Sequence, residues 1–201
     1  MLIKEIFSSI QGEGIHTGAP AIFIRLCGCN LRCSFCDTDH SAGKEMPLRQ
    51  IRQELRLIRA FTSSAPGSRL VVVTGGEPLI HERLGDLLEV IRGDGFMVEL
   101  ETNGTIRPDS KVLQYCNFIS MSPKVPREQI QLQGCTSLKI LFPFLPAIDA
   151  ESFRGYPCQA AYIQPIEVNG IIPTKEAIGE VKRLGWPFQL GLQLHKHLGV
   201  A

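Results

Sequence analysis

The stretch RLVVVTGGEP, residues 69–78, decides the fold class of this chain of 201 residues. Its first half is a nearly continuous apolar run, which is typical of a strand that is buried on both faces. Its second half opens with two glycines, and glycine at the end of a strand lets the backbone approach a ligand closely. A fully buried strand of this kind indicates a parallel sheet that is covered by helices.

Helical and strand-like patterns alternate on both sides of this stretch, without an internal repeat. Apolar residues at helical spacing predict helices over 47–61, 84–91 and 173–184. This order favours parallel pairing through right-handed crossovers. The chain is too short for a complete eight-fold barrel of about 250 residues, so an open partial barrel or a doubly wound sheet fits. The other expected strands are Ala21–Leu26, Phe96–Glu101, Phe118–Met121, Leu138–Phe142, Ala161–Gln164 and Phe188–Leu194.

Four of the expected strands are followed at once by a polar or Gly/Pro-containing motif. These motifs are GGEP, ETNG, SPK and QPIE. The carboxyl ends of parallel strands meet at one edge of a sheet or one mouth of a barrel, and ligands bind there. We therefore expect the four motifs to converge on one site.

The composition excludes several classes of protein. The chain has 21 Lys and Arg against 20 Asp and Glu, so its net charge of +1 argues against a broad nucleic-acid-binding face. No apolar run approaches the roughly 20 residues of a membrane span, and the N-terminus has no signal-peptide core. Seven cysteines are an odd number that a closed set of disulfides cannot use up. Thiolate metal ligands need a reducing compartment, so we expect a cytoplasmic protein.

Three of these cysteines, Cys29, Cys33 and Cys36, form a C-x3-C-x2-C array directly after the strand Ala21–Leu26. Thiolates are soft ligands, and three on one loop suit an iron–sulfur cluster or zinc. Structural zinc normally takes four protein ligands, and no second cysteine pair is present. Three ligands on a four-iron cluster would leave one iron open to a chelating small molecule.

Cys27 leaves two alternatives open, because it lies two residues before Cys29 and points to the same side of an extended chain. As a fourth ligand it would make the site an electron-transfer centre or, with zinc, a structural or interaction module. As a small buried hydrophobe at the strand end it would take no part in the site. We favour the buried hydrophobe.

The loop GCNLRCSFCDT, with Phe35 before the last cysteine, resembles the cluster loop of the radical S-adenosylmethionine (SAM) superfamily. SIQGEG at 9–14, the CDT extension, VVVTGGEP, ETNG, SPK, QP and the tail QLHKHLGVA are similar to the 7-carboxy-7-deazaguanine synthase family. These matches run from Ser9 to the last residue. The resemblance implies an α/β fold, namely a partial TIM-like β/α barrel of about six parallel strands. It also implies a single domain over 1–201 with the cluster loop at 27–38.

The resemblance further implies three cofactors, which are a [4Fe–4S] cluster on Cys29, Cys33 and Cys36, SAM, and Mg²⁺. Thr38 is the one protein ligand of Mg²⁺ that carries over, and Mg²⁺ commonly takes only one or two protein oxygens. A helix cap or Asx-turn is the alternative role of Asp37 and Thr38. The residues that the resemblance assigns to SAM are Phe35, Cys36, Asp37, Gly75, Gly76, Glu77, Ser122, Pro123, Lys124 and Gln164.

The reaction that the family resemblance implies is a ring contraction of 6-carboxy-5,6,7,8-tetrahydropterin to 7-carboxy-7-deazaguanine. A radical from SAM starts it, ammonia is lost, and the product serves queuosine biosynthesis. The residues expected to contact the substrate are Ile10, Gln11, Gly12, Glu13, Arg25 and Thr74. A guanidinium in mid-strand is costly unless it faces a carboxylate, so Arg25 is expected to bind the substrate carboxylate, or else to pair with Glu13 or Glu101.

The expected partners are the small pterin substrate and an external electron donor such as a flavodoxin, without nucleic acid or a membrane. The stretch 123–136 has no clear helix, so part of the barrel wall would be open, and we expect a homodimer to cover it. His195 and His197 alternate and would share one face of a terminal strand. A different radical SAM enzyme, such as a glycyl-radical activase, is the alternative function, although it should lack SIQGEG and Arg25.

Overall fold

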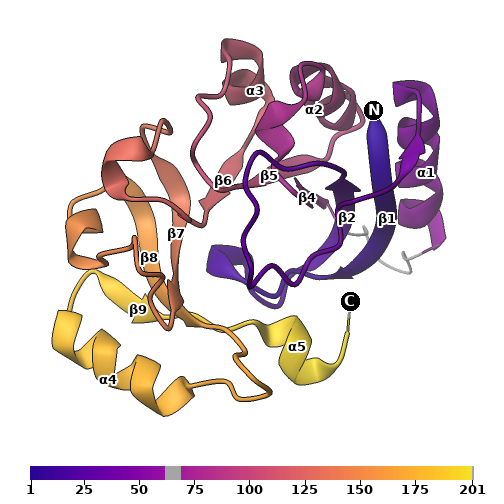
Figure 1. The fold of residues 1–201 in the computed structure, drawn as a ribbon. Helices are drawn as coiled ribbons and strands as arrows, with labels where there is room; N and C mark the ends of the chain where they lie inside the picture. Colours follow the sequence, from indigo (N-terminus) through magenta and orange to yellow (C-terminus); the bar gives the residue numbers. More distant parts are fainter. Residues whose placement is uncertain (62–68, 201) are drawn as a thin grey trace.

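The computed structural model describes residues 1–61 and 69–200, and its strands form one open, curved sheet (Figure 1). The strands are β1 (Leu2–Ile10), β2 (Pro20–Leu26), β3 (Lys44–Glu45), β4 (Leu70–Gly75), β5 (Met97–Thr102), β6 (Phe118–Met121), β7 (Cys135–Phe142), β8 (Cys158–Pro165) and β9 (Phe188–Leu190). Their order in the sheet is β3-β1-β2-β4-β5-β6-β7-β8-β9. Neighbouring strands from β2 to β9 run parallel. At one edge of the sheet, β1 pairs antiparallel with β2 on one side and with β3 on the other.

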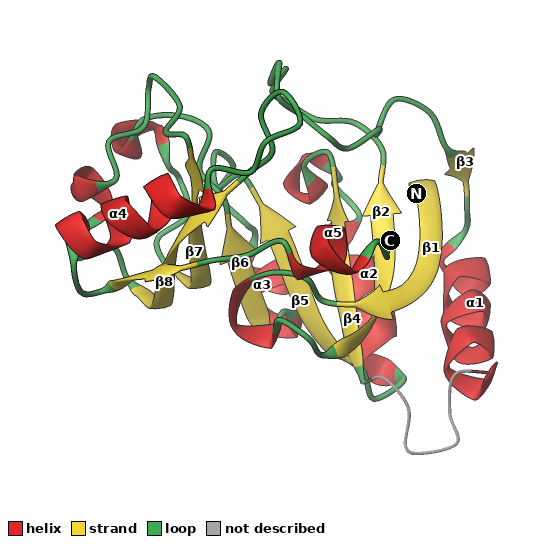
Figure 2. Ribbon diagram, turned by 90° about the horizontal axis from the view of Figure 1, so that it is seen from below, coloured by secondary structure: helices red, strands yellow, loops and turns green. Residues whose placement is uncertain are grey.

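The helices lie along the outside of the curved sheet, except for a short one near the C-terminus (Figures 1 and 2). They are α1 (Leu48–Phe61), α2 (Leu84–Gly93), α3 (Ser110–Tyr115), α4 (Thr174–Leu184) and α5 (Leu194–Leu198). The partial barrel is therefore confirmed, with seven parallel strands in the described part of the chain instead of about six. The expected gap in the helical wall is confirmed too, because the chain between β6 and β7 forms only a 3₁₀ turn, Arg127–Gln129.

The core lies between the sheet and its outer helices. One apolar cluster joins α1 and α2 to β2, β4 and β5, and includes Val71, Val73 and Leu87 at 0% exposure. A second cluster covers β7 and β8 and includes Leu138 and Ile140. Because successive strand residues point to opposite faces, the residues between these apolar ones point into the barrel. A small apolar cluster of Ala21, Phe23, Leu70 and Val72 fills the inward positions at the start of β2 and β4, and the inward positions toward the carboxyl ends of the strands can carry polar groups.

The two ends of the chain differ from the sequence-based expectation. Residues 2–10 form the long strand β1, which the sequence patterns do not predict. The last strand ends at Leu190 instead of Leu194, and the tail then forms the helix α5. The expectation that His195 and His197 share one face of a strand is wrong, because residues two apart lie on different sides of a helix. Within residues 1–61 and 69–200, every helix is too short or too polar to span a bilayer.

Candidate active site

A cavity of about 470 Å³ opens at the carboxyl ends of the parallel strands, where the strand-end motifs meet. Among the residues that line it are thirteen that the sequence predicts for the site: Glu13, Cys29, Cys33, Phe35, Cys36, Asp37, Thr38, Thr74, Gly75, Gly76, Ser122, Lys124 and Gln164. The other predicted residues, which do not line it, are Ile10, Gln11, Gly12, Arg25, Glu77 and Pro123. Five segments that are far apart in the sequence therefore contribute to one cavity.

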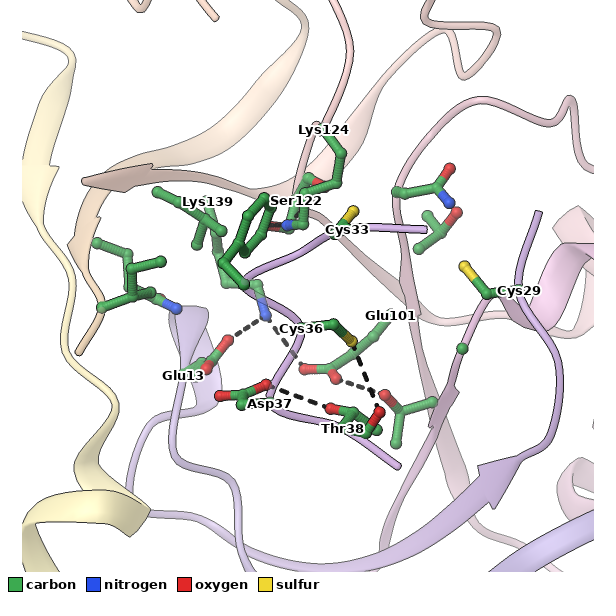
Figure 3. Close-up of a pocket in the computed structure, with 18 of the residues that line it drawn as sticks. Glu13, Cys29, Cys33, Cys36, Asp37, Thr38, Glu101, Ser122, Lys124 and Lys139 are labelled. Atoms are coloured by element: carbon green, nitrogen blue, oxygen red, sulfur yellow. Dashed lines mark hydrogen bonds and ion pairs between the residues drawn. The ribbon is translucent and has the colours of Figure 1, made fainter. Parts of the chain in front are cut away.

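The three cysteines of the cluster loop surround one open space within this cavity (Figure 3). Cys29 and Cys33 are half-buried and Cys36 is exposed, and all three are free thiols. Burial raises the pKa of Cys29 and Cys33, so metal binding has to displace their protons. In the described residues no group of three or more His, Cys, Asp or Glu side chains is arranged to hold a single metal ion. Three soft thiols spread around a hollow instead fit an iron–sulfur cluster, which is larger than one ion.

Cys27 lies outside this arrangement. It is 1% exposed, and burial raises the pKa of its thiol. Its sulfur packs beneath Gly43, where an added Cβ would be only 2.4 Å from Sγ. The structure therefore places Cys27 in the protein interior and not with the three thiols of the cavity.

The glycine loop after β4 lies against the cluster loop with no room for a side chain. A Cβ on Gly76 would be 2.0 Å from the carbonyl oxygen of Gly28 and 2.8 Å from Cβ of Cys29. Gly75 has φ +141°, a value that side chains disfavour, and a Cβ there would be 2.1 Å from the oxygen of Leu26. This contact brings the backbone of the loop to the cavity beside the cysteines.

Glu77 connects the GGEP and ETNG motifs. Its carboxylate accepts hydrogen bonds from Thr102 Oγ1 at 2.8 Å and from the backbone amides of Asn103 at 2.7 Å and Leu79 at 3.0 Å. Burial nevertheless raises the pKa of Glu77. Glu77 is 0% exposed and is not among the residues that line the cavity, so its role is to hold two cavity loops together.

The floor of the cavity is a set of charged side chains, of which Lys139 is buried and Glu13 and Glu101 are partly buried. Lys139 Nζ lies 2.5 Å from Glu13 Oε2 and 3.2 Å from Glu101 Oε1 (Figure 3). Gln193 Nε2 donates to Glu13 at 2.9 Å, and Thr74 Oγ1 donates to Glu101 at 2.8 Å. Burial by itself would raise the pKa of Glu13, but the ammonium of Lys139 and the hydrogen bonds from Lys139, Gln193 and Gln164 lower it to about 2. The floor thus presents the ionised carboxylate of Glu13 as a hydrogen-bond acceptor.

Arg25 belongs to an ion pair that the sequence analysis does not name. Its Nε lies 2.7 Å from Oε1 of Glu5, and its guanidinium lies 5.7 Å from the ring centroid of Phe7. Neither Glu13 nor Glu101, the expected carboxylates, is its partner. Arg25 still pairs in register with Thr74 of the neighbouring strand, so it lies on the inward face beside the cavity.

The remaining predicted residues lie behind the cavity wall. The Gln11 amide is 3.4 Å from both Glu99 Oε1 and Glu101 Oε1, and so supports the carboxylates of the floor. Gly12 lies under the ring of His195, where a Cβ would be 1.9 Å from Nδ1. Burial lowers the pKa of His195. The C-terminal segment therefore closes the cavity from one side.

Sequence reasoning did not assign several residues that the cavity brings together, namely Glu101, Ser120, Lys139, Gln193 and Lys196. A signal was present for two of them. Glu101 and Lys139 are charged residues in otherwise apolar strands, and the argument that singles out Arg25 applies equally to them. Lys196 pairs with Asp37 of the cluster loop, a contact that no local pattern indicates.

Comparison with known proteins agrees with this site. The family model of the Radical SAM superfamily matches residues 23–132, which is more than half of the chain. The 7-carboxy-7-deazaguanine synthase of Bacteroides thetaiotaomicron is 35% identical, with 98% of this chain and 97% of the relative covered. The enzyme of that name from Rickettsia prowazekii is 39% identical over 98% of this chain and 88% of the relative. Among solved structures, QueE from Escherichia coli has a TM-score of 0.67 at 26% identity, covering 96% of this chain and 94% of that one.

Proposed function

The chain belongs to the 7-carboxy-7-deazaguanine synthase family of radical SAM enzymes, and from this membership we propose which of its residues carry the reaction. It is a lyase-type enzyme of queuosine biosynthesis that uses a [4Fe–4S] cluster and SAM. The proposed reaction converts 6-carboxy-5,6,7,8-tetrahydropterin to 7-carboxy-7-deazaguanine with loss of ammonia. The observation that carries the proposal is that the three cysteines, the glycine loop and the carboxylates of Glu13 and Glu101 line one cavity.

On the cofactor side, Cys29, Cys33 and Cys36 are the proposed cluster ligands. When bound, the reduced cluster and SAM supply the 5′-deoxyadenosyl radical that begins the reaction. The backbone of Gly75 and Gly76 is free to contact SAM, because neither residue has a side chain in the way. The other residues proposed for the SAM side are Phe35, Asp37, Ser122, Pro123, Lys124 and Gln164, with Glu77 holding the loops in place.

On the substrate side, Glu13 is the proposed acceptor for the N–H groups of the pterin ring, because its ionised carboxylate accepts without donating. Thr74 adds a hydroxyl group, and the segment Ile10–Gly12 forms the adjoining wall. Arg25 is proposed for the substrate carboxylate, which would then replace Glu5 as its partner. Thr38 is the proposed protein ligand of Mg²⁺, beside the substrate carboxylate.

The test of this function is anaerobic incubation of the reconstituted, reduced enzyme with SAM, Mg²⁺ and the carboxy-tetrahydropterin. We expect 7-carboxy-7-deazaguanine to form, and we expect Cys29→Ala to abolish both product and SAM cleavage. SAM cleavage without any deazaguanine product would leave the superfamily intact and contradict the substrate.

The proposed assembly is a homodimer. Each subunit is proposed to be a single domain over residues 1–201, and a flavodoxin-like protein is the proposed external electron donor. The absence of an α-helix between β6 and β7 in the described chain supports a second subunit at that wall. Iron bound to thiolates supports a reducing compartment, the cytoplasm. Light scattering that finds only a monomer at micromolar concentration would contradict the dimer.

A further inference from the structure

Lys139 is a buried charge in a strand whose neighbouring residues are apolar. It lies in β7 at 3% exposure, and its neighbours Leu138 and Ile140 point outward into the apolar core. Its own side chain therefore points into the barrel and lines the cavity. Removing an ammonium from water is costly, and a whole buried ion pair can often be replaced by apolar residues without loss of stability. Replacing the lysine alone is different, because it leaves Glu13 and Glu101 without their counter-charge. A role in the cavity explains the lysine better than a role in the core.

The contacts of Lys139 orient two carboxylates at once. Its Nζ is the shared partner of Glu13 Oε2 and Glu101 Oε1, at 2.5 and 3.2 Å. The second oxygen of each carboxylate is held separately, by the amide of Gln193 for Glu13 and by the hydroxyl of Thr74 for Glu101. Each carboxylate is thus held from two sides, and the lysine determines how far apart the two are.

The cavity also contains polar atoms that lack a partner in the described chain. Ser120 Oγ, Gln164 Oε1 and Gln193 Oε1 are buried and make no hydrogen bond there, and all three residues line the cavity. Ser120 and Gln164 are each 1% exposed. Buried polar groups are rarely left unpaired, so these atoms point to a polar ligand that sits against the same floor as the two carboxylates.

We propose that Lys139 is a positioning residue for the substrate, whose ammonium holds Glu13 and Glu101 at a fixed spacing as acceptors for the N–H groups of a pterin ring. This inference rests on the proposed substrate. Without the ammonium, two neighbouring buried carboxylates repel each other and one of them takes up a proton. A protonated carboxyl group carries an O–H donor, which then faces the N–H donors of the pterin ring, so the hydrogen bond between carboxylate and ring is lost.

The test compares Lys139→Met with Lys139→Arg in the reconstituted enzyme. Calorimetry measures binding of the carboxy-tetrahydropterin without reductant, so that no turnover occurs. We expect Lys139→Met to weaken binding about tenfold or more, because charge-assisted acceptors are lost. Lys139→Arg keeps the charge, and we expect it to recover most of the affinity.

The pH dependence separates positioning from a purely structural role. In the wild type, the pKa of Glu13 lies at about 2, so this carboxylate adds no pH dependence to binding between about pH 5 and 7. Burial lowers the pKa of Lys124 to about 8, so the comparison stays below that value. In Lys139→Met burial is no longer opposed by the ammonium, the pKa of Glu13 rises, and binding is lost as the pH falls through the raised value. The other titratable groups that face this pair are Glu99, Lys124 and His195.

The double variant Glu13→Gln/Lys139→Met removes one of the two carboxylates that lose their ammonium, so Glu101 no longer faces a like charge. We expect it to recover the thermal stability that Lys139→Met loses, but not the affinity for the pterin. Wild-type affinity and a flat pH profile in Lys139→Met would overturn the inference, and so would recovery of affinity in the double variant. Either result leaves the proposed function intact, because the wild type still makes product. A wild type that binds no pterin overturns the proposed substrate and this inference with it.

Discussion

Glu13 shows at the scale of one residue how burial and charge compete. Burial disfavours its charged form, whereas the ammonium of Lys139 and the amides of Gln193 and Gln164 favour it, and the net effect lowers its pKa to about 2 from an ordinary 4.5. Because the pKa is lowered on folding, the ionised group stabilises the fold above the unfolded-state pKa. That stabilisation is lost as the pH falls through the folded-state pKa.

The first prediction concerns stability in acid. We expect the free energy of unfolding of the wild type to fall between about pH 4.5 and pH 2, with part of this fall due to Glu13. Glu13→Gln cannot titrate, so its unfolding free energy should depend less steeply on pH in that window. Urea titrations at a series of pH values measure the slope. Equal slopes in the two proteins would contradict the assignment of the acid sensitivity to Glu13.

The second prediction concerns the glycine loop. Gly76→Ala places a Cβ 2.0 Å from a backbone oxygen of Gly28, so the cluster loop has to move. We expect a loss of stability of about 1–3 kcal/mol, as for other overpacked sites, together with weaker SAM binding. The matched control is Gly179→Ala in α4, where nothing lies within 4 Å of the added carbon. The control should leave SAM binding unchanged and stabilise the helix by up to about 1 kcal/mol.

The third prediction separates the four cysteines of the loop. Cys27 packs under Gly43, so we expect Cys27→Ala to keep its cluster, and we expect Cys33→Ala to lose it. Iron and sulfide analysis after anaerobic reconstitution, with the visible spectrum, gives the answer. A cluster that disappears in Cys27→Ala would instead indicate an electron carrier with four cysteine ligands. A colourless wild-type protein with bound zinc would end the radical hypothesis.

At the scale of elements, α5 closes the cavity although it buries no residue of its own. Gln193, just before the helix, donates to Glu13, the amide of Leu194 donates to the oxygen of Gly12, and Lys196 pairs with Asp37 of the cluster loop. The last of these is an exposed ion pair, a kind that adds about 0–1 kcal/mol to stability. The contacts therefore matter more for the shape of the cavity than for the stability of the fold.

The fourth prediction follows from this helix. A chain that ends at Leu192 should keep most of its stability, because the removed segment contributes little to the core. It should bind the pterin about tenfold or more weakly, since buried hydrogen bonds to the floor are lost. Calorimetry and thermal unfolding measure the two effects. His197→Ala, at an exposed position of the same helix, serves as the control and should bind normally.

At the scale of the whole molecule, two apolar clusters on the outer side of the sheet lie beside different strands. They are joined because β5, β6 and β7 are neighbours in one continuous sheet. If one cluster unfolds, the strands of the other cluster lose their hydrogen-bonded neighbours in the sheet. We therefore expect the chain to unfold as one unit, as a single domain should.

The fifth prediction tests this unity. Leu87 and Leu138 are both 0% exposed, one in each cluster. We expect Leu87→Ala and Leu138→Ala each to lower the free energy of unfolding by about 2–5 kcal/mol and to shift one shared transition. The control is Leu113→Ala, at a side chain that is 52% exposed, which should change it by less than about 0.5 kcal/mol. Two separate transitions in urea, followed by circular dichroism, would contradict a single domain.

Much of this molecule follows from local patterns. The sequence by itself determined the parallel strands and the site at their carboxyl ends, because apolar runs and helical spacing act over a few neighbouring residues. The cysteine array was readable for the same reason, since its three thiols lie within one loop. The strand β1 was not predicted from the sequence, although it pairs with β2 over most of its length and places Glu5 opposite Arg25.

Only the tertiary structure decided which charges meet. The partner of Arg25 is Glu5 because antiparallel pairing places the two side by side, and no spacing in the sequence gives that register. Lys139 meets Glu13 across 126 positions of the chain because β7 and the segment after β1 come together inside the barrel. Buried ion pairs depend on which side chains converge, and convergence is a property of the folded chain. The cysteine loop could therefore be identified from the sequence, whereas the charged floor of the cavity could not.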